Sequence, residues 1–248
     1  MNKNNLAIDT DIFETEEYTT MLSPDIVDIT DNLATAKINS KKTIYRFFKR
    51  TLDIIGSLIG MIILVVAILV IYIIRKLIKE DDGSLFYNHL RYGKNGQKFK
   101  LYKFRSMCVD ADEKLKDYLK FNKEAKKEFE ENQKLQNDPR ITKIGKFLRK
   151  TSLDELPQML NILKGEMSFV GPRPIVDEEL KKYGKNKSVF LSVKPGLTGY
   201  WQVNGRSNTT YQERIDMELY YVKNYSFILD VKIFFKTFLT VLKKEGAM

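Results

Sequence analysis

The densest group of chemically capable residues lies at positions 151–158, where Asp154 and Glu155 stand side by side. Taken alone, Ser152-x-x-Glu155 is a capping-box pattern that predicts a helix start. Pro157 conflicts with that start, because it would occupy the fifth helical position, which needs a backbone N–H. A start two to four residues later places both carboxylates at a helix N-terminus, which favours ionised acids and attracts phosphate. Two hard oxygen donors there can also hold Mg²⁺.

Three further patterns suit phosphate recognition. Arg149 lies five residues before Asp154, and Arg173 follows the acidic pair between two prolines. An Arg with a fixed backbone suits bidentate phosphate recognition, although a Pro-Arg-Pro sequence can also simply mark a loop without a binding role. Residues 194–206 contain three glycines, whose backbone N–H groups could bind phosphate, but this segment lacks the order of a P-loop. Each pattern is weak by itself.

The composition narrows the chemistry. The 248 residues include one His and one Cys, which excludes a disulfide framework and a Cys/His zinc site. The chemistry must therefore use carboxylates, Lys, Arg, Ser, Thr or Tyr. At 43% hydrophobic residues the chain can bury a core, so wholesale disorder is excluded.

The net charge of +10 is unevenly distributed. Residues 1–40 carry eight acids and two bases, a balance of −6, so the remaining chain carries +16. Residues 1–40 show no amphipathic period and are predicted to form a flexible acidic arm. The basic body predicts an anionic partner: nucleic acid, an anionic lipid surface or a phosphorylated substrate.

The longest apolar run, at positions 54–74, has 21 residues without a charge. As a helix it would be about 30 Å long at ~1.5 Å per residue, enough to cross a hydrocarbon core. A buried core helix would need a larger protein around it, and a signal peptide would not start so far into the chain. Residues 41–80 are therefore predicted to form a membrane helix with basic flanks, and the three phosphate patterns gain weight on a membrane-tethered chain.

The flanking charges leave two topologies open. The bases before the run outnumber those after it, which favours a spanning helix with the N-terminus inside and the basic body exported. The alternative is a re-entrant helix that keeps both basic ends at the headgroups of one face. Gly56, Ser57 and Gly60 could allow such a bend, or could serve helix packing instead.

The remaining segments predict a mostly helical α+β fold. Residues 84–107 resemble a β-hairpin around the turn at 93–96. Residues 110–136 predict one solvated amphipathic helix that stops before Pro139. Residues 227–242 place large apolar side chains on one broad face, which fits either core packing or an interfacial helix in the membrane plane.

Several long motifs, in order, resemble the bacterial sugar transferases, the monotopic polyprenyl-phosphate phosphoglycosyl transferases. The resemblance runs from Lys49 to the C-terminus. The motifs are Lys49-Arg50-x-x-Asp53, Lys103-Phe104-Arg105-Ser106-Met107, Asp138-Pro139-Arg140-x-Thr142-x-x-Gly145, Ser152-Leu153-Asp154-Glu155-Leu156-Pro157-Gln158, Lys164-Gly165-Glu166-Met167-Ser168, Gly171-Pro172-Arg173-Pro174 and Lys194-Pro195-Gly196-x-Thr198-Gly199.

The resemblance implies a two-step transfer. Asp154 would attack the β-phosphate of a UDP-sugar, release UMP and hold the sugar phosphate, which polyprenyl (undecaprenyl) phosphate would then accept. Glu155 would assist the acceptor or, with Asp154, bind Mg²⁺. Glucose or galactose is the expected sugar, in exopolysaccharide or capsule synthesis. The substrate-binding residues implied by motif position are Arg149, Arg173, Lys194, Gln202 and Arg206.

The resemblance also implies a place in the cell. Residues 81–248 would form a catalytic domain on the cytoplasmic face of the cell membrane, anchored by the helix at 41–80. Family members commonly break this helix at a Ser-Pro pair, but the only such pair here is Ser23-Pro24, in the acidic arm. A re-entrant helix would therefore bend at residues 56–60. Tyr225 also stands where the family usually has Trp.

The alternative to an enzyme is a membrane-anchored basic binding or scaffold protein without catalysis. Nucleic-acid binding would need stacking aromatic residues on a basic face. The aromatic residues cluster instead in the apolar C-terminal stretch, so nucleic acid is not an expected partner. The expected partners are a UDP-sugar, polyprenyl phosphate and membrane lipids, and the formation of a homo-oligomer stays open.

Overall fold

The computed structural model describes residues 43–79, 83–132, 135–205 and 209–242. The contacts divide the chain into Met1–Ile44 and Tyr45–Met248, and the architecture that follows is that of the second unit. The predicted acidic arm at residues 1–40 lies outside the described residues.

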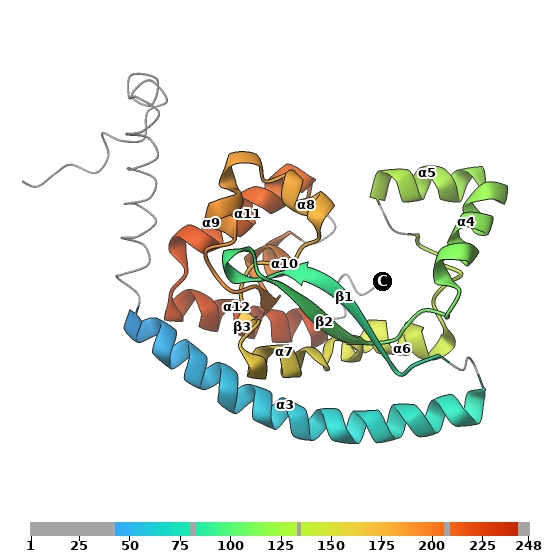
Figure 1. The fold of residues 1–248 in the computed structure, drawn as a ribbon, viewed down its shortest axis with the longest axis horizontal. Helices are drawn as coiled ribbons and strands as arrows, with labels where there is room; N and C mark the ends of the chain where they lie inside the picture. The colour runs from blue at the N-terminus through green and yellow to red at the C-terminus, as the bar shows by residue number, and fades with distance from the viewer. Residues whose placement is uncertain (1–42, 80–82, 133–134, 206–208, 243–248) are drawn as a thin grey trace, which may run out of the picture. The chain divides into compact units, whose positions relative to one another are not determined.

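The membrane-length helix α3 spans Thr43–Ile78 and is unbroken, with a gentle curve (Figure 1). It passes through Gly56, Ser57 and Gly60, where a sharp bend was one expectation, as a continuous α-helix. These small residues serve packing. A Cβ on Gly56 would lie 2.6 Å from Cε2 of Phe169, and Ser57 is fully buried. A larger side chain at these positions would push α3 away from the rest of the unit.

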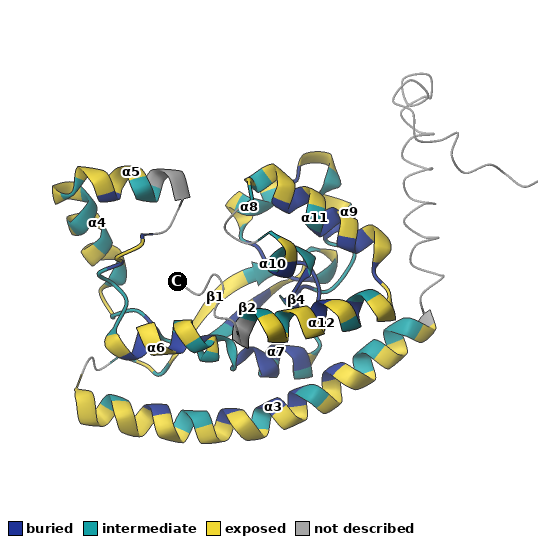
Figure 2. Ribbon diagram, turned by 180° about the vertical axis from the view of Figure 1, so that it is seen from behind, coloured by how far each residue is buried: buried dark blue, intermediate teal, exposed yellow. Residues whose placement is uncertain are grey.

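One stripe of α3 is buried while most of its surface is exposed (Figure 2). Leu64 and Ile71 pack with Phe104, Ile144 and Leu148 in one apolar cluster. Burying a side chain of this size contributes about 1.5–3 kcal/mol, so these contacts hold the helix against the remainder of the unit. α3 is also the one helix among the described residues that is long and apolar enough to cross a membrane.

The predicted hairpin is confirmed. Strands β1 (Phe86–Tyr92) and β2 (Lys98–Phe104) pair antiparallel around a 3-10 turn at Lys94–Gly96. Asn95 adopts a left-handed conformation in that turn (φ 57°), which asparagine tolerates better than most residues.

The single helix expected at residues 110–136 is wrong in one respect, because two helices occupy this segment. α4 spans Ala111–Phe121 and α5 spans Lys123–Asn132. Asn122 between them has an extended backbone, and its side-chain oxygen accepts a hydrogen bond from the Ala125 N–H at 2.9 Å. The side chain therefore competes with the helical backbone and starts a new helix.

The rest of the unit consists of short helices and two short strands, β3 and β4, which pair in parallel. The mostly helical α+β prediction is thus confirmed. The remaining elements are α6 (Lys143–Thr151), η3 (Leu153–Glu155), α7 (Gln158–Lys164), β3 (Ser168–Val170), α8 (Asp177–Lys181), η4 (Gly184–Asn186), α9 (Lys187–Phe190), β4 (Gly196–Thr198), α10 (Tyr200–Asn204), α11 (Tyr211–Asn224) and α12 (Phe227–Leu242).

α12 resolves into an inner and an outer face. Asp230 and Ile233 are buried against the unit, while the outer face is apolar and exposed (Figure 2). The N-terminal turns of α3 likewise carry two exposed aromatic side chains, Phe47 and Phe48. The exposed large apolar residues of α12 are Phe227, Ile228, Phe234, Phe235, Phe238 and Leu239. This exposure favours the interfacial reading of α12 over plain core packing.

Candidate active site

The acidic pair lies in a one-turn connection between two helices. α6 ends at Ser152, which adopts the left-handed conformation (φ 56°) and donates its N–H to the Arg149 carbonyl at 3.1 Å. Asp154 and Glu155 follow in η3, and Pro157 stands directly before α7, where no backbone donor is needed. Ser152 therefore ends one helix instead of capping the next, and the full α-helix begins later than the sequence predicts.

Asn161 holds α7 on the hairpin. Its side-chain nitrogen donates to the Lys100 carbonyl at 2.8 Å, and its side-chain oxygen accepts from the Tyr102 N–H at 3.1 Å. Asn161 is fully buried, so losing either bond would leave an unsatisfied polar group at a cost of about 1–3 kcal/mol. This pair of bonds sets the register of α7 against β2 and brings the next residue, Lys103, to the acids.

Lys103 bridges the two carboxylates. Its Nζ lies 2.7 Å from Glu155 Oε1 and 3.5 Å from Asp154 Oδ2. Lys103 belongs to one of the motifs in the sequence, but no role was predicted for it. A signal was present, because Phe99, Leu101 and Lys103 alternate onto the same face of β2, where an apolar residue is expected.

The pKa values of the two acids are shifted in opposite directions. Burial raises the pKa of Asp154 above its usual value, with Glu155 adding to the rise and Lys103 and Arg149 opposing it. Burial alone would also raise the pKa of Glu155, but Lys103 and Arg173 outweigh it and the pKa is lowered. The expectation that the position favours ionised acids holds for Glu155 and is wrong for Asp154. Adjacent carboxylates with separated pKa values are suited to different roles.

Both predicted arginines stand close to this pair. Arg149 donates from Nε to Ser106 Oγ at 2.9 Å; burial lowers its pKa, and the charge of Asp154 opposes that shift. Arg173 is half-buried and close enough to lower the pKa of Glu155. The arrangement places two guanidinium groups and one ammonium around two carboxylates, which suits a polyanionic substrate.

A buried acid supports the Arg173 loop. Glu218 on α11 is fully buried, and its Oε1 accepts the Arg173 N–H at 3.1 Å. Burial raises the pKa of Glu218 to about 7. Glu218 was not predicted from the sequence, because an acid within a helical pattern carries no sign that its face of the helix is buried.

The other three predicted substrate-binding residues show no contact with the acidic pair in the described part of the chain. Lys194 lines a cavity with Arg50, at the far end of α7. Gln202 donates its side-chain N–H to the Leu197 carbonyl at 3.1 Å and so braces β4. Arg206 lies outside the described residues.

The donor set is compatible with a magnesium ion shared with a substrate. No group of three or more His, Cys, Asp or Glu side chains that could hold a metal occurs among the described residues. Asp154 and Glu155 therefore offer two carboxylates at most. Mg²⁺ is usually bound by one or two carboxylates together with substrate phosphates and water, so this pair fits that mode.

The chain is similar in sequence to a family of known proteins and to several of its members. The family model described as bacterial sugar transferase matches residues 44–244. An uncharacterized sugar transferase of Haemophilus influenzae is 47% identical over 227 residues, covering 92% of this chain and 46% of that protein. The undecaprenyl-phosphate galactose phosphotransferase of Salmonella typhimurium is 47% identical over 209 residues, covering 84% of this chain and 43% of that protein.

A shorter relative matches over most of its length. The exopolysaccharide production protein ExoY of Rhizobium meliloti is 44% identical over 199 residues, covering 80% of this chain and 87% of that protein. The chain spans less than half the length of the first relatives it matches. The acidic pair, its lysine and both arginines all fall within the matched region.

Proposed function

The chain belongs to the bacterial sugar transferase family, and from this premise we propose that it transfers a sugar 1-phosphate from a UDP-sugar to polyprenyl phosphate and releases UMP. The observation that carries the proposal is the pair Asp154 and Glu155, bridged by Lys103 and flanked by Arg149 and Arg173. The names of relatives support undecaprenyl phosphate as the lipid and glucose or galactose as the sugar.

Asp154 acts as the nucleophile in this proposal. A carboxylate oxygen forms a bond to the β-phosphorus, the bond between that phosphorus and the bridging oxygen breaks, and UMP leaves with the electron pair. The lipid phosphate then attacks the same phosphorus and displaces the carboxylate, which yields sugar-diphospho-polyprenol and the free acid. The raised pKa of Asp154 supports this role, because a more basic carboxylate is a better nucleophile once ionised.

The neighbouring residues position the ammonium group of Lys103 and neutralise the negative charge of the substrate diphosphate in this proposal. Glu155, whose pKa is lowered, stays ionised and holds Lys103 in place. Arg149 and Arg173 lie where they can neutralise the diphosphate. We propose that Asp154 and Glu155 also hold Mg²⁺, which supplies charge neutralisation and orients the phosphates when bound.

We propose that α3 keeps both its ends on one side of the membrane, with the catalytic residues on the cytoplasmic face. The buried stripe from Asp53 to Ile71 packs against the unit along about 27 Å of helix, at ~1.5 Å per residue. A helix spanning the bilayer would draw that unit into the lipid. The exposed apolar faces of α3 and α12 support shallow insertion, and UDP-sugars are found in the cytoplasm.

The decisive experiment measures UMP release by the full chain in detergent, with polyprenyl phosphate, Mg²⁺ and a panel of UDP-sugars. We expect release with UDP-glucose or UDP-galactose. Without acceptor, a UDP-sugar labelled in the β-phosphate should leave label on the wild-type protein and none on Asp154→Asn. The matched control Asp117→Asn changes an exposed acid on α4 and should label like the wild type.

No UMP release with any sugar would contradict the transferase proposal and favour a scaffold without catalysis. Release with equal labelling of Asp154→Asn would keep the transferase but remove Asp154 as the nucleophile.

A further inference from the structure

A second concentration of charge surrounds a cavity of about 140 Å³ at the N-terminal end of α3. The cavity is separated from the acidic pair by α7. Asp154 and Glu155 precede the first residue of that helix, whereas Arg50, in the cavity wall, donates to the carbonyls of Ile162 and Leu163 at 2.6 and 2.7 Å near its last residue. The cavity is therefore distinct from the proposed catalytic centre.

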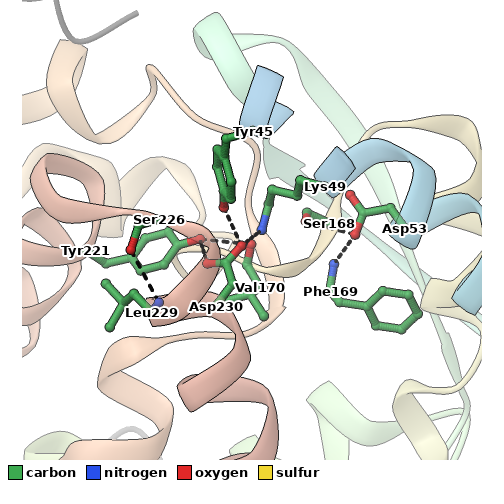
Figure 3. A network of polar contacts seen from close by, with 10 residues as sticks. All are labelled: Tyr45, Lys49, Asp53, Ser168, Phe169, Val170, Tyr221, Ser226, Leu229 and Asp230. Atoms are coloured by element: carbon green, nitrogen blue, oxygen red, sulfur yellow. Dashed lines mark hydrogen bonds and ion pairs between the residues drawn. The ribbon is translucent and has the colours of Figure 1, made fainter. Parts of the chain in front are cut away.

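The cavity wall holds more positive than negative charge. Its five cationic side chains face one carboxylate, Asp53, which accepts hydrogen bonds from Ser168 Oγ and the Phe169 N–H, both at 3.0 Å (Figure 3). Both bonds reach Oδ1, and the single negative charge of Asp53 does not balance the five positive charges. The five cations are Arg46, Lys49, Arg50, Lys94 and Lys194.

Three of these cations have partners among the described residues, and the side chains of the other two have none. Arg46 donates to the Tyr225 hydroxyl at 3.1 Å. Lys49 pairs with Asp230, which also accepts from the hydroxyls of Tyr45 and Tyr221 (Figure 3). Arg50 is bound to α7, as given above. The side-chain ammonium groups of Lys94 and Lys194 form no hydrogen bond or ion pair within the described part of the chain.

The chain therefore holds ammonium groups together against their mutual repulsion. Burial lowers the pKa of Lys94, and the charge of Arg46 lowers it further. Burial likewise lowers the pKa of Lys194; the charges of Arg50 and Lys94 add to this effect, and the charge of Asp53 opposes it. Burial and like-charge repulsion both disfavour the charged ammonium groups. A bound anion would offset these two effects, because it supplies further negative charge and hydrogen-bond acceptors.

We propose that this cavity binds the phosphate headgroup of an anionic membrane lipid, at a site separate from the reaction centre. The neighbouring surface favours a lipid over a free anion. The turns of α3 that line the cavity also carry exposed Phe47 and Phe48, and α12, which follows the lining residue Tyr225, begins with exposed Phe227 and Ile228. Acyl chains can lie on this apolar surface while the phosphate occupies the basic cavity.

The test uses the detergent-purified full chain and short-chain lipids. Dioctanoyl phosphatidic acid should raise the thermal unfolding temperature and bind saturably, whereas dioctanoyl phosphatidylcholine, which has no net charge, should do neither. Lys94→Gln combined with Lys194→Gln should weaken the affinity for phosphatidic acid about tenfold or more. Lys100→Gln, which removes an exposed charge from the same hairpin, should leave that affinity unchanged.

Three outcomes would overturn the proposal. Equal affinity in the double variant and the wild type would remove the cavity as the site. Equal stabilisation by inorganic phosphate at the same concentration would assign the cavity to a free anion instead of a lipid. Competition by UDP would assign it to the substrate. If the double variant does not fold, the single variant Lys94→Gln, which lies in the hairpin turn, should still bind phosphatidic acid more weakly than the wild type. Unchanged binding by that variant would contradict the proposed site.

Discussion

Two buried aspartates in this protein have opposite surroundings. Asp230 accepts hydrogen bonds or ion pairs from Tyr45, Lys49 and Tyr221, so its charge is fully engaged (Figure 3). Among the described side chains, Asp154 has only a 3.5 Å contact with Lys103. Both residues are 8% exposed, so burial does not distinguish them. The number of donors does: a satisfied carboxylate is structural, and a buried one with few donors is available for chemistry.

The largest expected effect comes from Asp154→Asn. UMP release should fall at least about a thousandfold, because an amide cannot form the phosphoaspartate. The thermal unfolding temperature should stay the same or rise, since the substitution removes a buried charge with few partners. Activity and unfolding measured on one preparation check both statements, and a lower unfolding temperature would mean that Asp154 resembles Asp230.

Asp230→Asn should produce the converse result. It leaves the half-buried Lys49 without its counter-ion and weakens the hydrogen bonds from two tyrosines, so we expect the free energy of unfolding to fall by about 2–3 kcal/mol. UMP release per folded molecule should be close to that of the wild type. Denaturant titration alongside the activity assay measures the two quantities, and the comparison between the aspartates fails if Asp230→Asn is inactive while folded.

Lys103→Met should have an intermediate effect on activity. Lys103 lowers the pKa of both acids, so its removal raises them and reduces the ionised fraction of Asp154. Because the reaction needs ionised Asp154, activity falls as the pH drops through its pKa, and in Lys103→Met this acid limb should lie at higher pH. The pH profile of UMP release measures the shift, and an unmoved limb would show that Lys103 does not tune Asp154.

Glu218→Gln should have the smallest effect, seen in the pH dependence of stability. The pKa of Glu218 in the folded protein, about 7, lies above the ordinary glutamate value of 4.5, so folded protein binds more protons than unfolded protein between these pH values. Wild-type stability should therefore decrease as the pH rises from about 5 to 7, and Glu218→Gln should remove part of this slope. Unfolding measured at several pH values tests this, and parallel curves for both proteins would contradict the raised pKa.

The sequence was informative wherever a feature depends on neighbours along the chain. The turn residues at 93–96 predicted the hairpin, and the uncharged run at 54–74 predicted α3. The same local reasoning missed the break at Asn122, because the apolar spacing continues across it and only the side-chain bond to Ala125 interrupts the helix. For the membrane helix, the flanking charges left two topologies open, and the packing of Gly56 and Ser57 shows only that this part of α3 lies against the rest of the unit.

By itself the sequence determined the adjacency of Asp154 and Glu155, the excess of positive charge and the apolar length of α3, because these follow from covalent order and composition. Only the tertiary structure decided which cations meet which acids. Lys103 reaches the acidic pair because Asn161 fixes α7 on β2, and Lys194 reaches the basic cavity at the other end of that helix. Electrostatic and hydrogen-bond energies depend on distance and burial, and long-range packing sets both.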